Sequence, residues 1–274
     1  MGPGKPRIVC VIGPTASGKS AHAVERALQD NGEVISVDSR QVYRTLDIGT
    51  EKISEEEMRG VPHHLIDIRD PKDAYSAGDF VADASQLITA MHERGVLPIL
   101  AGGTHFYFDA LLYGLPADTP PNDALRNELE VFTSEELLAR LRAIDPARAD
   151  ALDPENRRRI IRALEIVQEH GSVPKRSTES AYEIEWVVID PGRDELKERL
   201  ANRLQNALAR GLIEEVTRVR EHVGDARLEE LGLEYRIVGE YLKGEFPEME
   251  LYPRLLAKLT QYARRQRAWM RKLV

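Results

Sequence analysis

The stretch that decides the fold of this chain is Gly13-Pro14-Thr15-Ala16-Ser17-Gly18-Lys19-Ser20. An apolar run at residues 8–12 precedes it and a helical pattern at residues 21–28 follows it, so the glycine-rich turn lies between a strand and a helix. In that position backbone N–H groups form a concave nest, Lys19 adds a positive charge and the Ser20 hydroxyl suits Mg²⁺. The sequence therefore favours a phosphate-binding loop over a glycine-rich turn with one solvated lysine.

Composition is that of a folded globular protein. The chain has 274 residues, of which 42% are hydrophobic and 31% charged, enough to bury a substantial core. No apolar run approaches the roughly 20 residues that span a bilayer, and the first residues lack the apolar core of a signal peptide. We therefore expect a cytoplasmic protein with no membrane partner. The single cysteine, Cys10, excludes a disulfide framework and is expected to pack in the core.

The charge is unevenly distributed. A formal net charge of −8 argues against a generic nucleic-acid binder. However, residues 251–274 contain seven basic and no acidic residues, and a second basic cluster comprises Arg157, Arg158, Arg159 and Arg162. Each patch alone is consistent with a solvated helix face, whereas the two together suggest a surface for phosphate backbones.

Strand and helix patterns alternate through the first part of the chain. Strands are predicted at residues 33–37, 63–68 and 96–101, and a capping box at residues 76–79 predicts the start of a helix. The first of these strands ends at Asp38 and the last ends at Gly102-Gly103-Thr104. This order predicts the α/β fold of P-loop nucleotide kinases, with a parallel sheet covered by helices on both faces. Ligands of such sheets bind at the carboxyl ends of the strands.

The middle of the chain has a different character. Prolines cluster at residues 116–121, and helical patterns continue to about His170 with no strand candidate. A strand at residues 185–189 is then expected to rejoin the sheet, and leucines from Leu196 to Ile213 mark one long amphipathic helix. We therefore predict a core of residues 1–115 and 185–274, with residues 116–184 forming an inserted, mainly helical lobe.

Several side chains are candidates for chemistry. Asp38 is suited to act as a general base, as a water-mediated Mg²⁺ ligand or as a cap of its strand end. Thr104 offers a hydroxyl to an anion or simply forms a tight turn before a helix. His63 and His64 lack partners at metal-ligand spacing and are expected to be structural. Trp269 either stacks on a base or packs in the core.

These motifs, in this order and spacing, resemble those of the bacterial tRNA dimethylallyltransferases over nearly the whole chain. A phosphate loop alone would be unspecific, whereas its combination with Asp38–Tyr43 and the Gly-Gly-Thr strand end is specific. Besides these, the matching segments are Asp47–Thr50, Pro62–Asp67, Tyr75–Phe80, Arg162–Glu165, Gly211–Val216, Tyr241–Glu245 and Ala263–Gln266 with Trp269.

The resemblance implies transfer of a dimethylallyl group from dimethylallyl diphosphate to N6 of the adenosine just 3′ of the anticodon, with release of diphosphate. The loop residues Gly13 to Ser20 would then bind a prenyl diphosphate, although the motif alone suggests ATP. Lys19, Thr104 and Mg²⁺ held on Ser20 would stabilise the leaving group, while Asp38 would take the proton from N6.

The resemblance also implies a tRNA partner, bound through its anticodon stem–loop. We expect the enzyme to be a monomer. The target base would be flipped out of its stack to reach the diphosphate site. The inserted lobe and the basic C-terminal helix would hold the RNA. The residues implied in tRNA binding are Asp38, Ser39, Arg40, Gln41, Thr104, Arg126, Arg158, Arg159, Ile160, Ile161 and Arg162.

The chain departs from the family pattern in two places. The family commonly has a glycine where this chain has Glu234, ahead of Tyr235-Arg236, and a Thr-Arg pair where this chain has Leu259-Thr260. The main alternative function is an ATP-dependent nucleotide or small-molecule kinase on the same fold, but we find no Walker-B-like aspartate pair and no arginine-rich lid segment. A non-catalytic RNA-binding P-loop switch would leave Asp38 and Thr104 without a task.

Overall fold

The computed structural model describes residues 4–117, 119–120, 122–174 and 177–272. The chain forms two compact units. The larger comprises Met1–Leu112 and Ala181–Val274, and the smaller comprises Tyr113–Ser180. The smaller unit thus ends a few residues before the predicted limit of 184, because the strand that re-enters the larger unit already starts at Glu183.

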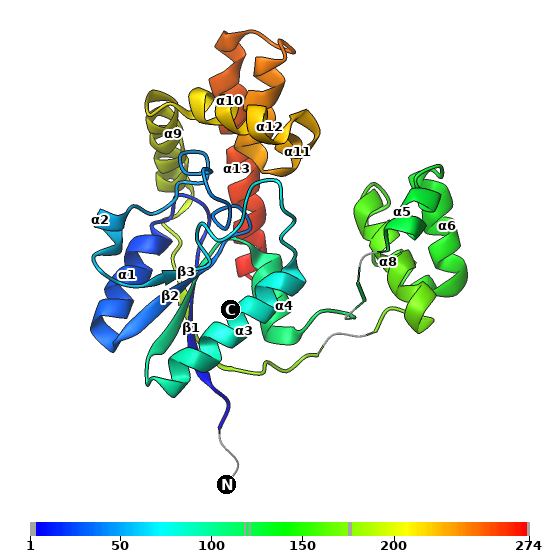
Figure 1. The fold of residues 1–274 in the computed structure, drawn as a ribbon, viewed down its shortest axis with the longest axis horizontal. Coiled ribbons are helices and arrows are strands. Elements are labelled where there is room, and N and C mark those ends of the chain that lie inside the picture. The colour runs from blue at the N-terminus through cyan, green and yellow to red at the C-terminus, as the bar shows by residue number, and fades with distance from the viewer. Residues whose placement is uncertain (1–3, 118, 121, 175–176, 273–274) are drawn as a thin grey trace. The chain divides into compact units, whose positions relative to one another are not determined.

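A five-stranded parallel sheet forms the centre of the larger unit. Its strand order is β3-β2-β4-β1-β5, and every neighbouring pair is parallel. Residues 8–12 of β1, which lies between β4 and β5, are all buried, as expected for a strand covered on both faces. Figure 1 shows α1 on one side of the sheet and α3 on the other. The strands are β1 (Arg7–Ile12), β2 (Gly32–Val37), β3 (His63–His64), β4 (Leu97–Gly102) and β5 (Glu183–Val188).

Local sequence explains where the first helices begin and end. Helix α3 (Ala77–Glu93) starts at the predicted capping box, in which Ser76 and Asp79 cap one another reciprocally. Its apolar stripe includes Phe80 and Ile88, which are buried against the sheet. The other helices of this part are α1 (Lys19–Asp30), α2 (Glu55–Met58) and α4 (His105–Tyr113).

Two predicted elements are shorter than expected. The strand predicted at residues 63–68 ends at His64, because Leu65 and Asp67 have φ angles of 61° and 58°, a left-handed conformation that cannot continue a strand. The long helix predicted from Leu196 to Ile213 is two helices, because Gly211 has a φ of 97° and starts a new one. Apolar periodicity continues across this break, so the pattern alone did not reveal it.

The C-terminal part of the larger unit is helical. Helix α13 buries one stripe along its length, including Leu251, Leu255, Leu259 and Gln266, and it packs against α9 and α12. The elements are α9 (Arg193–Ala209), α10 (Leu212–Val223), α11 (Asp225–Glu230), α12 (Leu233–Leu242), a 3₁₀ helix (Glu248–Glu250) and α13 (Leu251–Met270).

The smaller unit is helical in its described residues and has its own apolar core. Leucines of α6 pack with isoleucines of α8 in one cluster, which includes Leu137, Leu141 and Ile160. The elements are α5 (Asp123–Leu129), α6 (Ser134–Ile144), α7 (Pro146–Asp150) and α8 (Arg157–His170).

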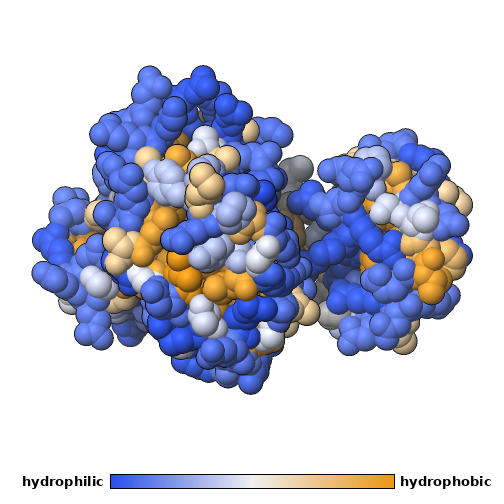
Figure 2. All heavy atoms as spheres, turned by 90° about the horizontal axis from the view of Figure 1, so that it is seen from above, coloured by the Kyte–Doolittle hydropathy of each residue, from blue (hydrophilic) through white to orange (hydrophobic). Residues whose placement is uncertain are grey.

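The face drawn in Figure 2 is largely hydrophilic, with hydrophobic atoms gathered near the middle of the larger unit. Among the described residues, no helix combines the length and the apolar character needed to cross a membrane.

Candidate active site

The glycine-rich loop joins β1 to α1, as predicted. Gly18 has a φ of 91° and occupies the position before the first turn of α1, a conformation that favours glycine. A Cβ atom on Gly13 would lie 2.5 Å from the carbonyl oxygen of Ile189, so a larger residue does not fit there. Successive N–H groups in front of a helix N-terminus suit an anion. Ser20 lies in the first turn of α1 and is exposed.

Lys19 lies against this loop. Its Nζ donates a hydrogen bond to the carbonyl oxygen of Pro14 at 2.8 Å. Burial lowers the pKa of Lys19 to about 8, an effect that the carboxylate of Asp38 opposes and the charge of Arg203 reinforces. Burial destabilises the charged form of a lysine, and an anion placed beside it stabilises that form. The position of Lys19 therefore suits the binding of a phosphate group.

Asp38 follows the last residue of β2. Its Oδ1 accepts hydrogen bonds from the backbone N–H groups of Arg40 and Gln41, at 2.8 and 3.3 Å. These bonds show that Asp38 does cap the turn after its strand. Its Oδ2 makes no hydrogen bond within the described part of the chain, so this oxygen remains available to accept a proton.

Thr104 follows β4 and lies next to the end of β2. The backbone N–H of Ser39 donates to Thr104 Oγ1 at 3.0 Å, and the N–H of Thr104 donates to the carbonyl oxygen of Val37 at 3.1 Å. A Cβ on Gly102 would lie 2.1 Å from that same carbonyl oxygen, which explains the glycine. The structure thus brings together Asp38 and Thr104, two residues predicted from separate motifs.

Gln266 connects this corner to the phosphate loop. Its side chain is 3% exposed. Its Oε1 accepts from the backbone N–H of Thr15 at 2.7 Å, and its Nε2 donates to the carbonyl oxygen of Gly103 at 3.1 Å. Sequence reasoning identified Gln266 only as part of a family motif and gave it no role, because nothing local indicates its partners.

Arg203 on α9 is a candidate site residue that the sequence analysis missed. Its guanidinium donates to Thr15 Oγ1, and its Nε lies 2.7 Å from Oε2 of Glu51. In the sequence pattern, Arg203 lies beside the apolar stripe of α9, where a solvated arginine is common. Only the three-dimensional structure shows that it reaches the loop. A second cation therefore lies beside Lys19.

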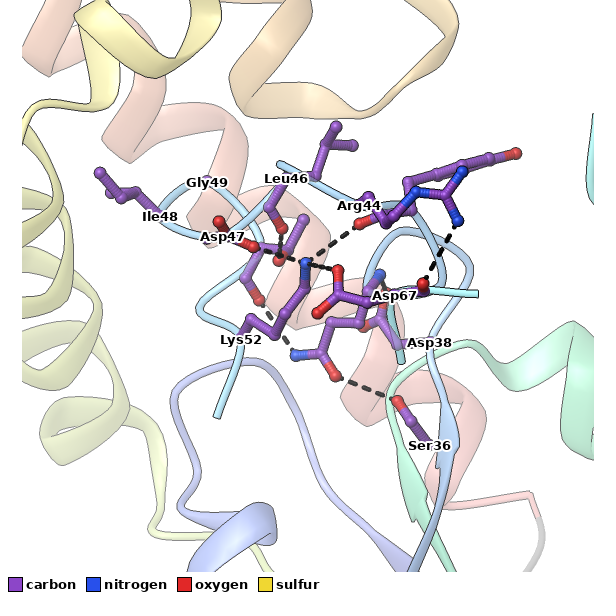
Figure 3. A network of polar contacts seen from close by, with 12 residues as sticks. Ser36, Asp38, Arg44, Leu46, Asp47, Ile48, Gly49, Lys52 and Asp67 are labelled. Atoms are coloured by element: carbon purple, nitrogen blue, oxygen red, sulfur yellow. Dashed lines mark hydrogen bonds and ion pairs between the residues drawn. The ribbon is translucent and has the colours of Figure 1, made fainter. Parts of the chain in front are cut away.

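The loop after Asp38 is held by internal polar contacts, shown in Figure 3. The amide of Gln41 accepts from Ser36 Oγ at 3.0 Å and donates to the carbonyl oxygens of Thr50 and Glu51. Lys52 Nζ donates to Asp47 and Asp67, at 2.6 and 2.5 Å. Gln41, a predicted tRNA contact, is thus used to shape this loop.

The same loop is anchored to the C-terminal helices by Glu215. The carboxylate of Glu215 on α10 accepts from the backbone N–H groups of Asp47, Ile48 and Gly49, at 2.7 to 3.1 Å. Tyr235 on α12 donates its hydroxyl to the same carboxylate at 2.7 Å. The matching segments Asp47–Thr50 and Gly211–Val216 of the sequence therefore meet in the structure.

The other predicted tRNA contacts lie in the smaller unit. Arg126 and Arg162 bind Glu165, whose side chain is fully buried, at 2.7 and 2.9 Å. Arg158 and Arg159 are exposed at the start of α8. The side chains of Ile160 and Ile161 are buried in the core of this unit. Their side chains are therefore not available on the surface of this unit, and a role for these two residues in tRNA binding stays a prediction.

Trp269 stacks on a histidine. Its ring lies 4.0 Å from the ring of His105, and the two planes are 6° apart. Burial, together with the charge of Lys19, lowers the pKa of His105 to about 4, so the histidine is neutral at physiological pH. Trp269 is half-buried, so one face of its ring packs on a protein side chain, and stacking on a base stays a prediction.

Comparisons with known proteins agree with this geometry. The family model described as IPP transferase matches residues 41–273. The tRNA dimethylallyltransferases of Thermomicrobium roseum and Halalkalibacterium halodurans are 43% and 40% identical to this chain, covering 97% of it and 84% and 88% of their own lengths. Neither relative is a kinase.

Solved structures give the same result. The full-length tRNA isopentenylpyrophosphate transferase of Bacillus halodurans has a TM-score of 0.74 and 38% identity, covering 97% of this chain and 87% of its own. A eukaryotic dimethylallyltransferase described as acting on tRNA has a TM-score of 0.84 and 28% identity, covering 96% of this chain and 69% of its own. The chain therefore belongs to the IPP transferase family, to which the tRNA dimethylallyltransferases belong.

Proposed function

We propose that this protein transfers a dimethylallyl group from dimethylallyl diphosphate to N6 of the adenosine 3′ of the anticodon in tRNA. The observation that carries this proposal is the hydrogen bond between the Ser39 N–H and Thr104 Oγ1, at 3.0 Å. It joins the ends of β2 and β4 and so places Asp38, a potential base, in the same corner of the sheet as a hydroxyl. Gln266 links that corner to the phosphate loop.

The loop would bind the diphosphate as a leaving group. Negative charge grows on the bridging oxygen as the allylic C–O bond breaks, and donors that are already in place stabilise it without reorganisation. The candidate donors are the backbone N–H groups of Ala16, Gly18, Lys19 and Ser20, together with the side chains of Lys19 and Arg203. Pro14 has no N–H, and the N–H groups of Thr15 and Ser17 are bonded to Gln266 and to the carbonyl oxygen of Pro14. The diphosphate leaves with the electron pair of the broken bond.

Asp38 would act on the other reactant. The lone pair of the adenine N6 amine is delocalised into the ring, so the amine is a poor nucleophile. As the new N6–C bond forms, N6 loses a proton, and Oδ2 of Asp38 would accept it while Oδ1 stays bonded to the backbone of Arg40 and Gln41.

The Ser20 hydroxyl suits Mg²⁺ as one hard oxygen ligand. No group of three or more His, Cys, Asp or Glu side chains that could hold a metal occurs within the described ranges. The protein would therefore contribute few ligands, and substrate phosphates with water would supply the others, which is the usual arrangement for Mg²⁺. Bound there, Mg²⁺ would neutralise charge on the diphosphate.

For the tRNA, we infer contacts from both units. Ser39, Arg40 and Thr104 would meet the flipped nucleoside, and Arg158 and Arg159 offer exposed positive charge to the RNA backbone. Arg126 and Arg162 keep N–H groups beyond those bound to Glu165, since each guanidinium has five. Because tRNA is the substrate, we infer that the protein acts in the cytoplasm.

The deciding experiment incubates the protein with unmodified tRNA, labelled dimethylallyl diphosphate and Mg²⁺. We expect label in the RNA at the adenosine next to the anticodon, together with released diphosphate. Absence of label in RNA, combined with ATP hydrolysis that a small acceptor stimulates, would refute prenyl transfer and favour the kinase alternative.

A further inference from the structure

Glu234 is a partly buried carboxylate near the phosphate loop, and the structure gives it a specific neighbour. It lies in the first turn of α12, and its side chain is 16% exposed. Its Oε1 lies 3.8 Å from Nη2 of Arg203 on α9, which is equally buried. A carboxylate in the first turn also interacts favourably with the helix dipole, but that effect alone would not require burial against an arginine.

Arg203 links Glu234 to the phosphate loop. The guanidinium of Arg203 donates to Thr15 Oγ1 within the loop and pairs with Glu51 at 2.7 Å. Its charge also contributes to the low pKa of Lys19. Glu234 is therefore connected to Thr15 of the phosphate loop through one intervening side chain, that of Arg203.

The geometry indicates that Glu234 contributes charge to Arg203 and does not set its orientation. A separation of 3.8 Å is too long for a hydrogen bond, whereas Thr15 and Glu51 hold the guanidinium at closer range. The charge of Glu234 still has a large effect on Arg203, because two partly buried charged groups interact more strongly than they would in water. Arg203 thus has two carboxylate partners before any phosphate binds.

The surroundings of Glu234 have opposing effects on its negative charge. Burial raises the pKa of Glu234, the carboxylates of Asp38 and Glu51 raise it further, and Arg203 opposes them. A diphosphate beside Arg203 would add another negative charge to this set. Glu234 and a diphosphate therefore both favour proximity to the same guanidinium while repelling each other.

We propose that Glu234 is an affinity-determining residue that competes with the diphosphate group of the substrate for the positive charge of Arg203. This inference rests on the proposed function, since it requires the loop to bind a diphosphate. A neutral residue at this position would leave more of the charge of Arg203 to the ligand. Diphosphate would then bind more tightly and leave more slowly after the reaction.

The test measures the binding of inorganic diphosphate with Mg²⁺ by calorimetry at pH 8. We expect Glu234→Gln to lower the Kd about tenfold. In a partly buried environment, removing one negative charge close to the bound anion should change the dissociation constant by about a factor of ten. Glu234→Gly should act in the same direction, which guards against an effect peculiar to glutamine. The matched control is Glu240→Gln, which removes the same charge from the same helix and should change the Kd less than twofold.

A double mutant shows whether Glu234 acts through Arg203. In an Arg203→Gln background, Glu234→Gln should change the Kd less than twofold, because the shared cation is gone. Unchanged or weaker binding in the single Glu234 variants would overturn the competition, weaker binding showing that Glu234 orients Arg203 instead. Failure of the unmodified protein to bind inorganic diphosphate would overturn the proposed function and this inference with it.

Discussion

Replacing Gln266 by leucine tests whether the phosphate loop depends on the C-terminal helix. Gln266 is 3% exposed and makes two hydrogen bonds, with the N–H of Thr15 and the carbonyl oxygen of Gly103. Leucine has a similar volume and keeps the apolar contacts of α13. The substitution therefore removes two polar contacts and leaves two backbone groups without their partner.

The expected cost follows from these two groups. A buried polar group left without a partner costs about 1–3 kcal/mol, so two groups cost about 2–6 kcal/mol. Thr15 is only half-buried, and its N–H can recruit water, which favours the lower part of that range. We expect the free energy of unfolding of the larger unit to fall by about 3 kcal/mol.

Tryptophan fluorescence during urea denaturation isolates this effect. The chain has two tryptophans, and both Trp186 and Trp269 belong to the larger unit. We also expect kcat/KM for dimethylallyl diphosphate to fall about 10–100-fold, because small displacements of positioning groups have effects of that size. Gln261→Leu is the control, since Gln261 is exposed on the same helix. Equal stability and activity of the two variants would refute a bracing role for Gln266.

Three further substitutions or conditions test the site and the smaller unit. Asp38→Asn should lower kcat about 10²–10⁴-fold while the Kd for tRNA changes little; equal losses in single-turnover and binding assays would mean that Asp38 only positions RNA. Because the pKa of Lys19 is lowered to about 8, the lysine loses its charge above that pH, so kcat/KM for the prenyl diphosphate should fall between pH 8 and 9.5; a flat profile would contradict this. Glu165→Gln should lower the free energy of local opening of α8, measured by hydrogen exchange, by about 3 kcal/mol, whereas Glu169→Gln at an exposed position should not. Because the pKa of Glu165 is lowered in the folded protein, its contribution to stability is fully present above the ordinary carboxyl pKa and is lost progressively as the pH falls from there through the lowered folded-state pKa.

The sequence predicted those parts of the site that depend on local motifs. The phosphate loop, Asp38 and Thr104 each follow a short apolar strand, and parallel strands bring such ends to one edge of a sheet. The meeting of Asp38 with Thr104 follows from that rule, whereas the order of the strands in the sheet is known only from the structure. The capping box at Ser76 likewise fixed the start of α3, because its two partners are three residues apart.

Contacts between distant segments could not be predicted in this way. Gln266 and Thr15 are 251 residues apart, and Arg203 and Thr15 are 188 residues apart. Arg162 and Glu165, three residues apart on one helix, could have been recognised as a pair, but Arg126 reaches the same carboxylate only through the fold of the smaller unit. The basic cluster at residues 157–162 therefore suggested more free positive charge than the structure shows.

The position of these distant contacts changes what the C-terminal helices are expected to do. The sequence assigned the basic stretch at residues 251–274 to the RNA. In the structure, however, α13 supplies Gln266 and α9 supplies Arg203, and both contact Thr15, one through its backbone and the other through its hydroxyl. Since Thr15 lies within the phosphate loop, the geometry of that loop depends on α9 and α13, which come from the opposite end of the chain. Substitutions on the buried faces of α9 and α13 should therefore raise the Kd for diphosphate more than the Kd for tRNA. Replacing exposed arginines on α13 should raise the Kd for tRNA alone.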